Sequence, residues 1–106
     1  MSIATIEIQP RVVDVTITNE MLSIVLEDGR IIFAPLKWYP RLLDASEAER
    51  NGWRVFEDSD GRDIIFWESL DELIPAIAVI DGTPSRESNR SLEHWRAARR
   101  MKVQVG

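Results

Sequence analysis

The chain has 106 residues, of which 44% are hydrophobic and 29% charged, with a formal net charge of −5 and no cysteine. This length supports a single domain, 1–106, with one modest core, and the many large apolar residues make intrinsic disorder a poor interpretation. The absence of cysteine excludes disulfides, thiolate catalysis, iron–sulfur clusters and zinc–cysteine sites.

The sequence carries no signal for a membrane or for secretion. Its apolar runs are shorter than the ~18 residues of a membrane-spanning helix, and Met1–Pro10 lacks the apolar region of a secretory signal. We therefore expect a cytoplasmic protein that does not enter a membrane. Within the single domain, residues 1–10 and 101–106 are expected to be flexible.

Three strands are predicted at the start of the domain. Arg11–Thr18 and Met21–Glu27 alternate between apolar and polar residues, as half-buried strands do, and Arg30–Ala34 follows as a third strand. One face of the first strand is expected to carry Val13, Val15 and Ile17. Asp28 and Gly29 are typical of a type I′ turn, in which both residues have positive φ. The pattern predicts an antiparallel three-stranded meander.

Two short helical segments follow the meander. Pro35 ends the third strand, and Trp38–Leu42 is expected to be a loop that turns into a helix with Pro40 at its first position. Ser46–Glu49 has the capping-box pattern of a short helix that stops at Gly52.

Two more strands are predicted in the second half of the chain. They are Trp53–Glu57 and Asp63–Trp67, joined by the polar turn Asp58–Arg62. Ser69–Glu72 is a second capping-box pattern, and Pro75 limits the helix that it would start to little more than a turn.

The last part of the chain is predicted to be helical. Pro75–Ile80 is apolar enough to be buried and Asp81–Pro84 stops it, after which a final helix runs from about Ser85 or Ser91 to Arg100. The apolar face of this helix is expected to carry Leu92, Trp95 and Ala98. The fold class is α+β: an antiparallel sheet of about five strands that begins with the meander, short helices packed on one side, and a C-terminal helix.

Charge is unevenly distributed along the chain. Residues 1–85 carry 7 basic and 16 acidic residues, a balance of −9, whereas residues 86–106 carry 6 basic and 2 acidic residues, a balance of +4. Arg96, Arg99 and Arg100 are expected to point outward and to form a partner-binding patch. The alternative is that the arginines of this helix complement its own terminal carbonyls and the acidic body.

The residues offer little for catalysis. His94 is the single histidine, so a histidine metal site or catalytic triad would depend on it alone. Asp58, Asp60 and Asp63 surround a glycine, but a tight turn stabilised by Asp side chains explains them better than a calcium loop. We expect no catalytic residue, metal ligand or cofactor, and expect the protein not to be an enzyme.

The aromatic residues indicate a core and an interface. All four tryptophans, Trp38, Trp53, Trp67 and Trp95, are expected mostly in the core, although Trp38–Arg41 also has the composition of an interaction hot spot. From this block we expect Trp38, Tyr39 and Arg41 to bind a partner. Arg41 is also predicted to pair with Asp71 or Glu72. The residues expected to have structural roles are Asp28, Gly29, Pro40, Trp67, Asp71 and Trp95.

Several blocks of the sequence together resemble a bacterial family, domain-of-unknown-function family 2442, over about residues 11–100. The blocks are Asp28-Gly29-Arg30, Trp38-Tyr39-Pro40-Arg41-Leu42, Trp67 with Leu70-Asp71-Glu72, Gly82–Ser88 and Ser91–Trp95. The chain departs from the family pattern at Phe66, Glu68 and Leu73, where the family usually has His, Pro and Asp. The resemblance implies a small α+β domain, and a toxin–antitoxin pairing has been suggested for such proteins and their encoded neighbours.

Three hypotheses of function follow. The leading one is a non-catalytic protein–protein interaction module, such as an antitoxin-like or regulatory adaptor. The second is a nucleic-acid-binding accessory protein that uses the Arg-rich final helix, although an acidic body does not attract nucleic acid. The third is an enzyme in which Asp71 or Glu72 transfers protons. A homodimer is expected through an open sheet edge, because Val12–Thr18 carries a single charged residue.

Overall fold

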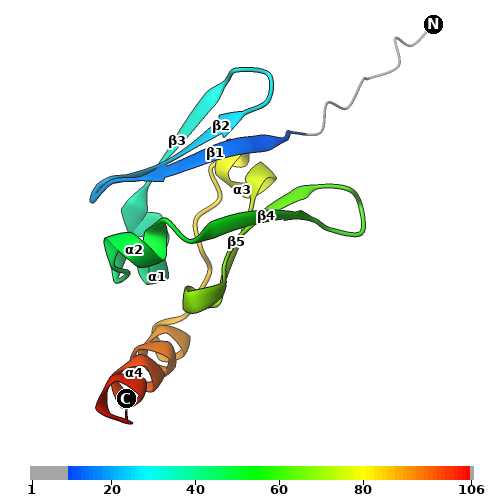
Figure 1. Ribbon diagram of the computed structural model, residues 1–106. Coiled ribbons are helices and arrows are strands. Elements are labelled where there is room, and N and C mark those ends of the chain that lie inside the picture. Colours follow the sequence, from blue (N-terminus) through cyan, green and yellow to red (C-terminus); the bar gives the residue numbers. More distant parts are fainter. Residues whose placement is uncertain (1–9, 106) are drawn as a thin grey trace, which may run out of the picture.

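The computed structural model describes residues 10–105, with only the backbone described for residues 102–105 (Figure 1). The flexibility expected for residues 1–9 and 106 lies outside the described residues. Among residues 10–105, no helix is both long enough and apolar enough to cross a membrane.

The first sheet confirms the predicted meander. Its three antiparallel strands, in the order β1-β2-β3, are β1 (Val12–Ile17), β2 (Met21–Leu26) and β3 (Ile31–Pro35). The pairing register of β1 shifts between Val12 and Asp14, so Val13 is 54% exposed although Val15 is buried. The expectation that Val13 and Val15 share a face is therefore wrong, because a bulge reverses the alternation locally.

Two hairpins end in turns of the same geometry. Gly29 donates to the carbonyl of Leu26, and Leu26 donates to the carbonyl of Arg30. The turn at residues 58–62 repeats this pattern. φ is positive at Gly29 (93°), but not at Asp28. The expected type I′ turn is therefore wrong, and the pattern is that of a longer hairpin loop with glycine in the left-handed position.

The side chains of Asp28 and Asp58 stabilise these turns. Asp28 accepts from the backbone N–H of Arg30 at 3.0 Å, and Asp58 accepts from the backbone N–H groups of Asp60 and Arg62 at 2.8 and 2.9 Å. This confirms that Asp side chains hold the turn at 58–62.

A second sheet replaces the single five-stranded sheet that the sequence predicted. Its antiparallel strands, in the order β4-β5-β6, are β4 (Trp53–Glu57), β5 (Asp63–Trp67) and β6 (Glu72–Pro75). Within residues 10–105, each sheet pairs only with its own strands. The single sheet is wrong because residues 36–50, which form short helices, carry the chain away from the first sheet before β4 begins.

The sixth strand forms where the sequence predicted a helix start. Glu68–Leu70 is a single 3-10 turn, η2, and Asp71 follows in the left-handed conformation with φ 50° and ψ 45°. The predicted helix at Ser69–Glu72 is therefore wrong: Asp71 ends the turn and directs the chain into β6, where Leu73 pairs with Phe66.

The short helices between the two sheets follow the sequence predictions. η1 (Leu36–Trp38) leads into α1 (Pro40–Leu43), which has Pro40 at its first position. In α2 (Glu47–Arg50), the Ser46 hydroxyl accepts from the Glu49 backbone at 3.1 Å, and the Glu49 carboxylate accepts from the Ser46 backbone at 2.9 Å. The predicted capping box is confirmed.

One core joins the two sheets. Leu22 and Ile24 from the first sheet and Ile65 and Trp67 from the second belong to the same buried cluster. Figure 1 shows the sheets one above the other, and α3 (Ala76–Asp81) contacts β3, β5 and β6. The indole N–H of the fully buried Trp67 donates to the carbonyl of Arg50 at 2.9 Å, so this large ring also satisfies its polar atom.

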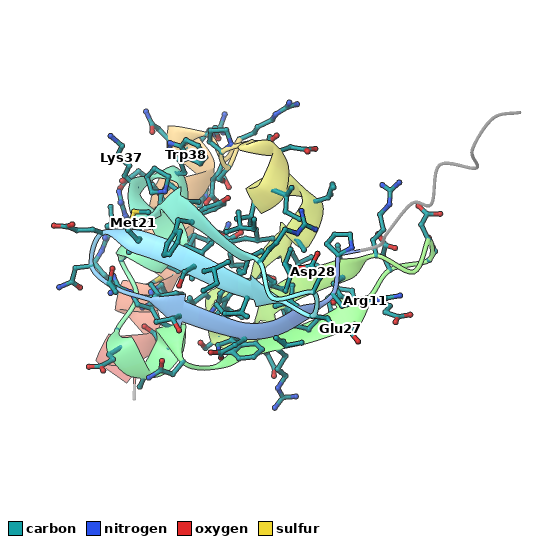
Figure 2. The ribbon with its side chains drawn as sticks, turned by 90° about the horizontal axis from the view of Figure 1, so that it is seen from above. Arg11, Met21, Glu27, Asp28, Lys37 and Trp38 are labelled. Atoms are coloured by element: carbon teal, nitrogen blue, oxygen red, sulfur yellow. The ribbon has the colours of Figure 1, made fainter. Side chains whose placement is uncertain are left out.

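A buried carboxylate fastens the first strand to the second sheet. Asp63 is 6% exposed and accepts from the backbone N–H of Val12 at 2.8 Å and from the guanidinium of Arg11 at 2.9 Å. Arg11 also binds Glu57 at 2.9 Å. Figure 2 shows Arg11 beside Glu27 and Asp28, at the opposite end of the molecule from Lys37 and Trp38.

The final helix, α4 (Asn89–Val105), extends away from the sheets beyond α1 and α2 (Figure 1). Leu92 is buried and Trp95 is partly buried against the core, whereas Ala98 is exposed. The expected apolar stripe therefore holds for Leu92 and Trp95 but not for Ala98. The side of α4 that faces the body continues to Arg99, which binds Glu49, and Ala98 lies off that side.

Candidate functional site

Three segments that are distant in the sequence meet on one surface. They are the loop at residues 38–41, the turn at residues 70–73 and the stretch at residues 83–88 between α3 and α4. Gly82 ends α3 in the left-handed conformation with φ 74°, which turns the chain back toward η1. The backbone N–H of Ser85 then donates to the carbonyl of Trp38 at 3.1 Å, so residues 83–88 lie against the loop at residues 38–41.

Arg41 holds these three segments together. Its Nε donates to both carboxylate oxygens of Glu87, at 2.9 and 3.0 Å, and its Nη1 donates to the carbonyls of Asp71 and Leu70, at 2.9 and 3.3 Å. The side chains of Arg41 and Glu87 are 15% and 10% exposed. The hydrogen bond from Arg41 holds the pKa of Glu87 below its usual value.

The predicted pairing of Arg41 with Asp71 is present, but it is not the main contact of Arg41. The Asp71 carboxylate lies 3.9 Å from Arg41 and its side chain is 91% exposed, so Asp71 acts mainly through its backbone carbonyl. Glu87 is the main carboxylate partner, and the sequence reasoning missed it. Its signal was its place as the one acidic residue in the Gly82–Ser88 block.

Trp95 joins α4 to the same turn. Its indole N–H donates to the carbonyl of Leu70 at 2.9 Å, and the guanidinium groups of Arg41 and Arg99 lie 5.3 and 4.6 Å from its ring centre. These distances are within the range of cation–π attraction. The final helix is therefore fixed to the site by one indole and the arginines on both sides of it.

The expected outward patch of arginines is wrong for two of its three members. Arg99 donates to both oxygens of Glu49 at 2.8 and 2.9 Å, and Arg96 donates to Asp44. The hydrogen bond from Arg99 lowers the pKa of Glu49 to about 2. Arg100 is exposed. The helix thus complements the acidic body, because the carboxylates of α2 and of the residue after α1 face it.

Beside the Arg41 cluster lies a pocket of about 220 Å³. Its walls come from β6, from Ala78 of α3 and from residues 83–86, and Tyr39 and Glu72 are part of its lining. A shallower cleft of about 500 Å³ adjoins it, shares Glu72 and Leu73, and is bordered by Arg41 and Glu87. The pocket and this cleft form one continuous site, which we call the β6 cleft.

Two polar atoms of the pocket lining are left without partners. Tyr39 is 2% exposed, and its hydroxyl, like Oε2 of Glu72, is buried and has no hydrogen-bond partner among residues 10–105. Burial raises the pKa of Glu72 to about 7, against the attraction of Arg41 and with the repulsion of Glu87. Burial, with a smaller contribution from Glu72, also raises the pKa of Tyr39. A buried polar atom without a hydrogen-bond partner destabilises the folded chain. A ligand that supplies the missing hydrogen bonds would therefore be favoured at this place.

The structure brings together some of the residues expected to bind a partner and separates others. Tyr39 and Arg41 lie in the β6 cleft, and Trp38 lies next to it, partly buried. The expected structural residue Asp28 lies at the opposite end of the molecule from Trp38 (Figure 2). Within the described part of the chain, no three histidine or acidic side chains gather closely enough to hold a metal ion.

Comparison with known protein families identifies a match over most of the chain. Residues 12–85 match the model of a family described as "Protein of unknown function (DUF2442)", which covers the chain from β1 to the stretch after α3. The matched part includes Tyr39, Arg41 and Glu72, and it ends before Glu87 and α4. No curated protein and no solved structure matches the chain.

Proposed function

Because the chain belongs to the DUF2442 family, whose function is unknown, we propose from its geometry that it is a non-catalytic protein–protein interaction module. The finer role that we propose, an antitoxin-like or regulatory adaptor, rests on the family resemblance alone. The observation that carries this proposal is the β6 cleft, where a pocket with two unpartnered polar atoms opens beside a shallow groove.

The size of the pocket favours a side chain over a larger ligand. Sites for drug-sized molecules are typically about 300–1,000 Å³, and this pocket is about 220 Å³. The adjoining groove gives room for the backbone of a partner on the surface. A pocket that takes one anchoring side chain beside a shallow polar groove is the usual arrangement of an interaction hot spot.

The cleft is already in place without a partner. Arg41 fixes the groove by binding Glu87 and the turn at residues 70–73, and Trp95 fixes the same turn from α4. A preformed site lowers the entropy that binding costs, because few side chains need to be ordered.

Selection of peptides from a random displayed library on the full chain tests this function. In Ala78→Met, a longer side chain fills the pocket, and Ile77→Met is the matched control because Ile77 is exposed on the same helix outside the lining. We expect selected peptides to bind the unchanged protein and the control alike, and to bind Ala78→Met at least about tenfold more weakly. Failure to select any peptide, or equal binding to Ala78→Met, would contradict the proposal.

A second candidate function is proton transfer by Glu72. The observation in its favour is that this carboxyl lies in the pocket with its pKa raised to about 7, which suits a general acid or base. The exposed Asp71 has no such support. Turnover of any member of a panel of nitrophenyl esters, phosphates and glycosides, lost in Glu72→Gln, would favour this candidate over binding alone.

Other parts of the interaction hypothesis have different support. Nucleic-acid binding by α4 has less support, because Arg96 and Arg99 bind carboxylates of the acidic body and are not free to bind phosphates.

Self-association is supported by the outer face of the first sheet, where Ile31 and Phe33 are 52% and 61% exposed. We propose a homodimer through this sheet, and a monomer mass in light scattering at micromolar concentration would contradict it.

A further inference from the structure

On the premise of the proposed function, we infer that the pocket at Tyr39, Glu72 and Ala78 recognises the cationic end of a lysine or arginine side chain of the partner. The inference names the chemistry of the ligand, which the β6 cleft alone leaves open.

The walls of the pocket suit the stem of such a side chain. Leu73, Ile74, Pro75, Ala78 and Pro84 contribute to the lining, and most of the surface they present is apolar. Lysine and arginine carry a run of methylene groups that packs on apolar surface while the charged end seeks polar atoms. A small polar ligand without such a stem would leave these walls in contact with water.

The polar atoms of the pocket suit the charged end. The Glu72 carboxylate is an acceptor, and the Tyr39 hydroxyl can accept as well as donate. Both residues hold a buried polar atom that lacks a partner among residues 10–105. An ammonium or guanidinium group supplies several N–H donors and a positive charge, and so suits a carboxylate and a hydroxyl acceptor. The two unpartnered atoms are themselves buried, so a cation reaches them only when their side chains turn toward the pocket. A carboxylate or phosphate would instead meet the charge of Glu72.

The charges around Glu72 favour a cation over an anion. Tyr39, just before α1, and Arg41, within α1, face the Glu72 carboxyl. Asp71 faces it from the same turn, and Arg86 and Glu87 face it from residues 83–88. Arg41 is already bound to Glu87 and to two carbonyls. Arg86 is exposed and also lines the pocket, so its positive charge offsets that of Asp71. The charge left over is that of the Glu72 carboxylate, which attracts a cation when it is ionised.

Binding of a cation is expected to depend on pH. Burial raises the pKa of Glu72 to about 7, so the carboxyl is mostly protonated at pH 6 and mostly ionised at pH 8. A cation binds the ionised form, and the ionised fraction at pH 6 is about one tenth of that at pH 8. The affinity should therefore be about tenfold weaker at pH 6.

Titration of the ¹⁵N-labelled full chain with n-butylammonium and n-butylguanidinium, followed by amide chemical shifts, tests the inference. 1-Pentanol and butyrate are the uncharged and anionic controls of similar length. We expect both cations to shift the amides of Leu73, Ala78 and Ser85 at pH 8, the tighter one showing whether lysine or arginine is preferred. The shifts should be lost in Glu72→Gln and in Ala78→Met and retained in Ile77→Met.

Four results would overturn the cation site: binding of 1-pentanol as tight as that of the cations, tighter binding of butyrate at pH 6, no dependence on pH, or cation binding unchanged in Glu72→Gln. If Tyr39 donated a hydrogen bond directly to Glu72, both polar atoms would be satisfied without a cation, and 1-pentanol would bind as tightly as the cations. Glu72→Gln removes a buried charge, so it is expected to fold, and its amide spectrum checks this.

The two proposals fail separately. Selected peptides that bind the β6 cleft but share no lysine or arginine would overturn the cation site and leave the protein-binding function standing. Binding of the two cations in the pocket without any selected peptide would overturn the protein-binding function and leave the cation site standing.

Discussion

Glu72→Gln is expected to stabilise the protein at pH 8 and to flatten the dependence of its stability on pH. The folded chain holds the Glu72 carboxyl in a buried position that raises its pKa from 4.5 to about 7. Gln keeps the shape of the side chain but removes the ionisable group, and its amide can donate to the unpartnered Tyr39 hydroxyl.

The magnitude follows from the two pKa values. Below pH 4.5 the carboxyl is protonated in the folded and the unfolded chain, so its ionisation costs nothing. Between pH 4.5 and 7 the unfolded chain loses the proton while the folded chain keeps it, so the free energy of unfolding falls as the pH rises. Above pH 7 the full loss has been reached, about 3 kcal/mol for the rise from 4.5 to about 7.

Other carboxylates leave this range of pH clear. The pKa of Glu49 is lowered to about 2 and that of Glu87 is lowered by Arg41, so both stay ionised in the folded chain above pH 5. Their stabilising contribution is present above the usual carboxyl pKa and is lost only as the pH falls below it. A fall in stability from pH 5 to pH 8 therefore reports on Glu72.

Urea unfolding followed by tryptophan fluorescence at pH 5, 6, 7 and 8 measures the effect. We expect Glu72→Gln to exceed the stability of the unchanged protein by about 1 kcal/mol or less at pH 5 and by up to about 3 kcal/mol at pH 8. Glu68→Gln is the matched control, because Glu68 is exposed on η2 four residues earlier. Parallel pH profiles for Glu72→Gln and the unchanged protein would refute the reasoning.

Three further predictions concern the contacts around the cleft. Arg41→Ala should destabilise the protein by about 3–5 kcal/mol in urea unfolding, because it leaves the poorly exposed Glu87 carboxylate unpaired, and Arg41→Lys should recover only part of this since lysine lacks the planar fork. Arg99→Glu should cost about 1 kcal/mol by breaking a partly exposed salt bridge to α2, whereas Arg100→Glu should leave the melting temperature unchanged; equal effects of the two reversals would contradict the ion pair. Asp71→Gly should be neutral or stabilise by up to about 1 kcal/mol in thermal unfolding, because glycine adopts its left-handed backbone without strain, and a loss above about 1 kcal/mol would show that the Asp71 side chain has a role of its own.

The sequence alone determined the features that depend on a few neighbouring residues. The alternation of Met21–Glu27 predicted β2, the Ser46 and Glu49 pair predicted the capping box, and Pro40 predicted the start of α1. The family blocks also located Tyr39 and Arg41, which the structure places in the β6 cleft. These features can be predicted because each depends on residues only a few positions apart, whose local preferences agree with the final fold.

The tertiary structure decided what depends on residues far apart in the chain. A left-handed Asp71 turned a predicted helix into β6, and the short helices between β3 and β4 placed β4, β5 and β6 in a sheet of their own. Arg41 binds Glu87, 46 residues away, more closely than it binds the carboxylates of the turn at residues 70–73. Arg96 and Arg99 bind carboxylates of the acidic body and do not form an outward patch. The raised pKa of Glu72 has the same origin, since burial comes from the elements packed around a carboxyl and no spacing along the sequence encodes it.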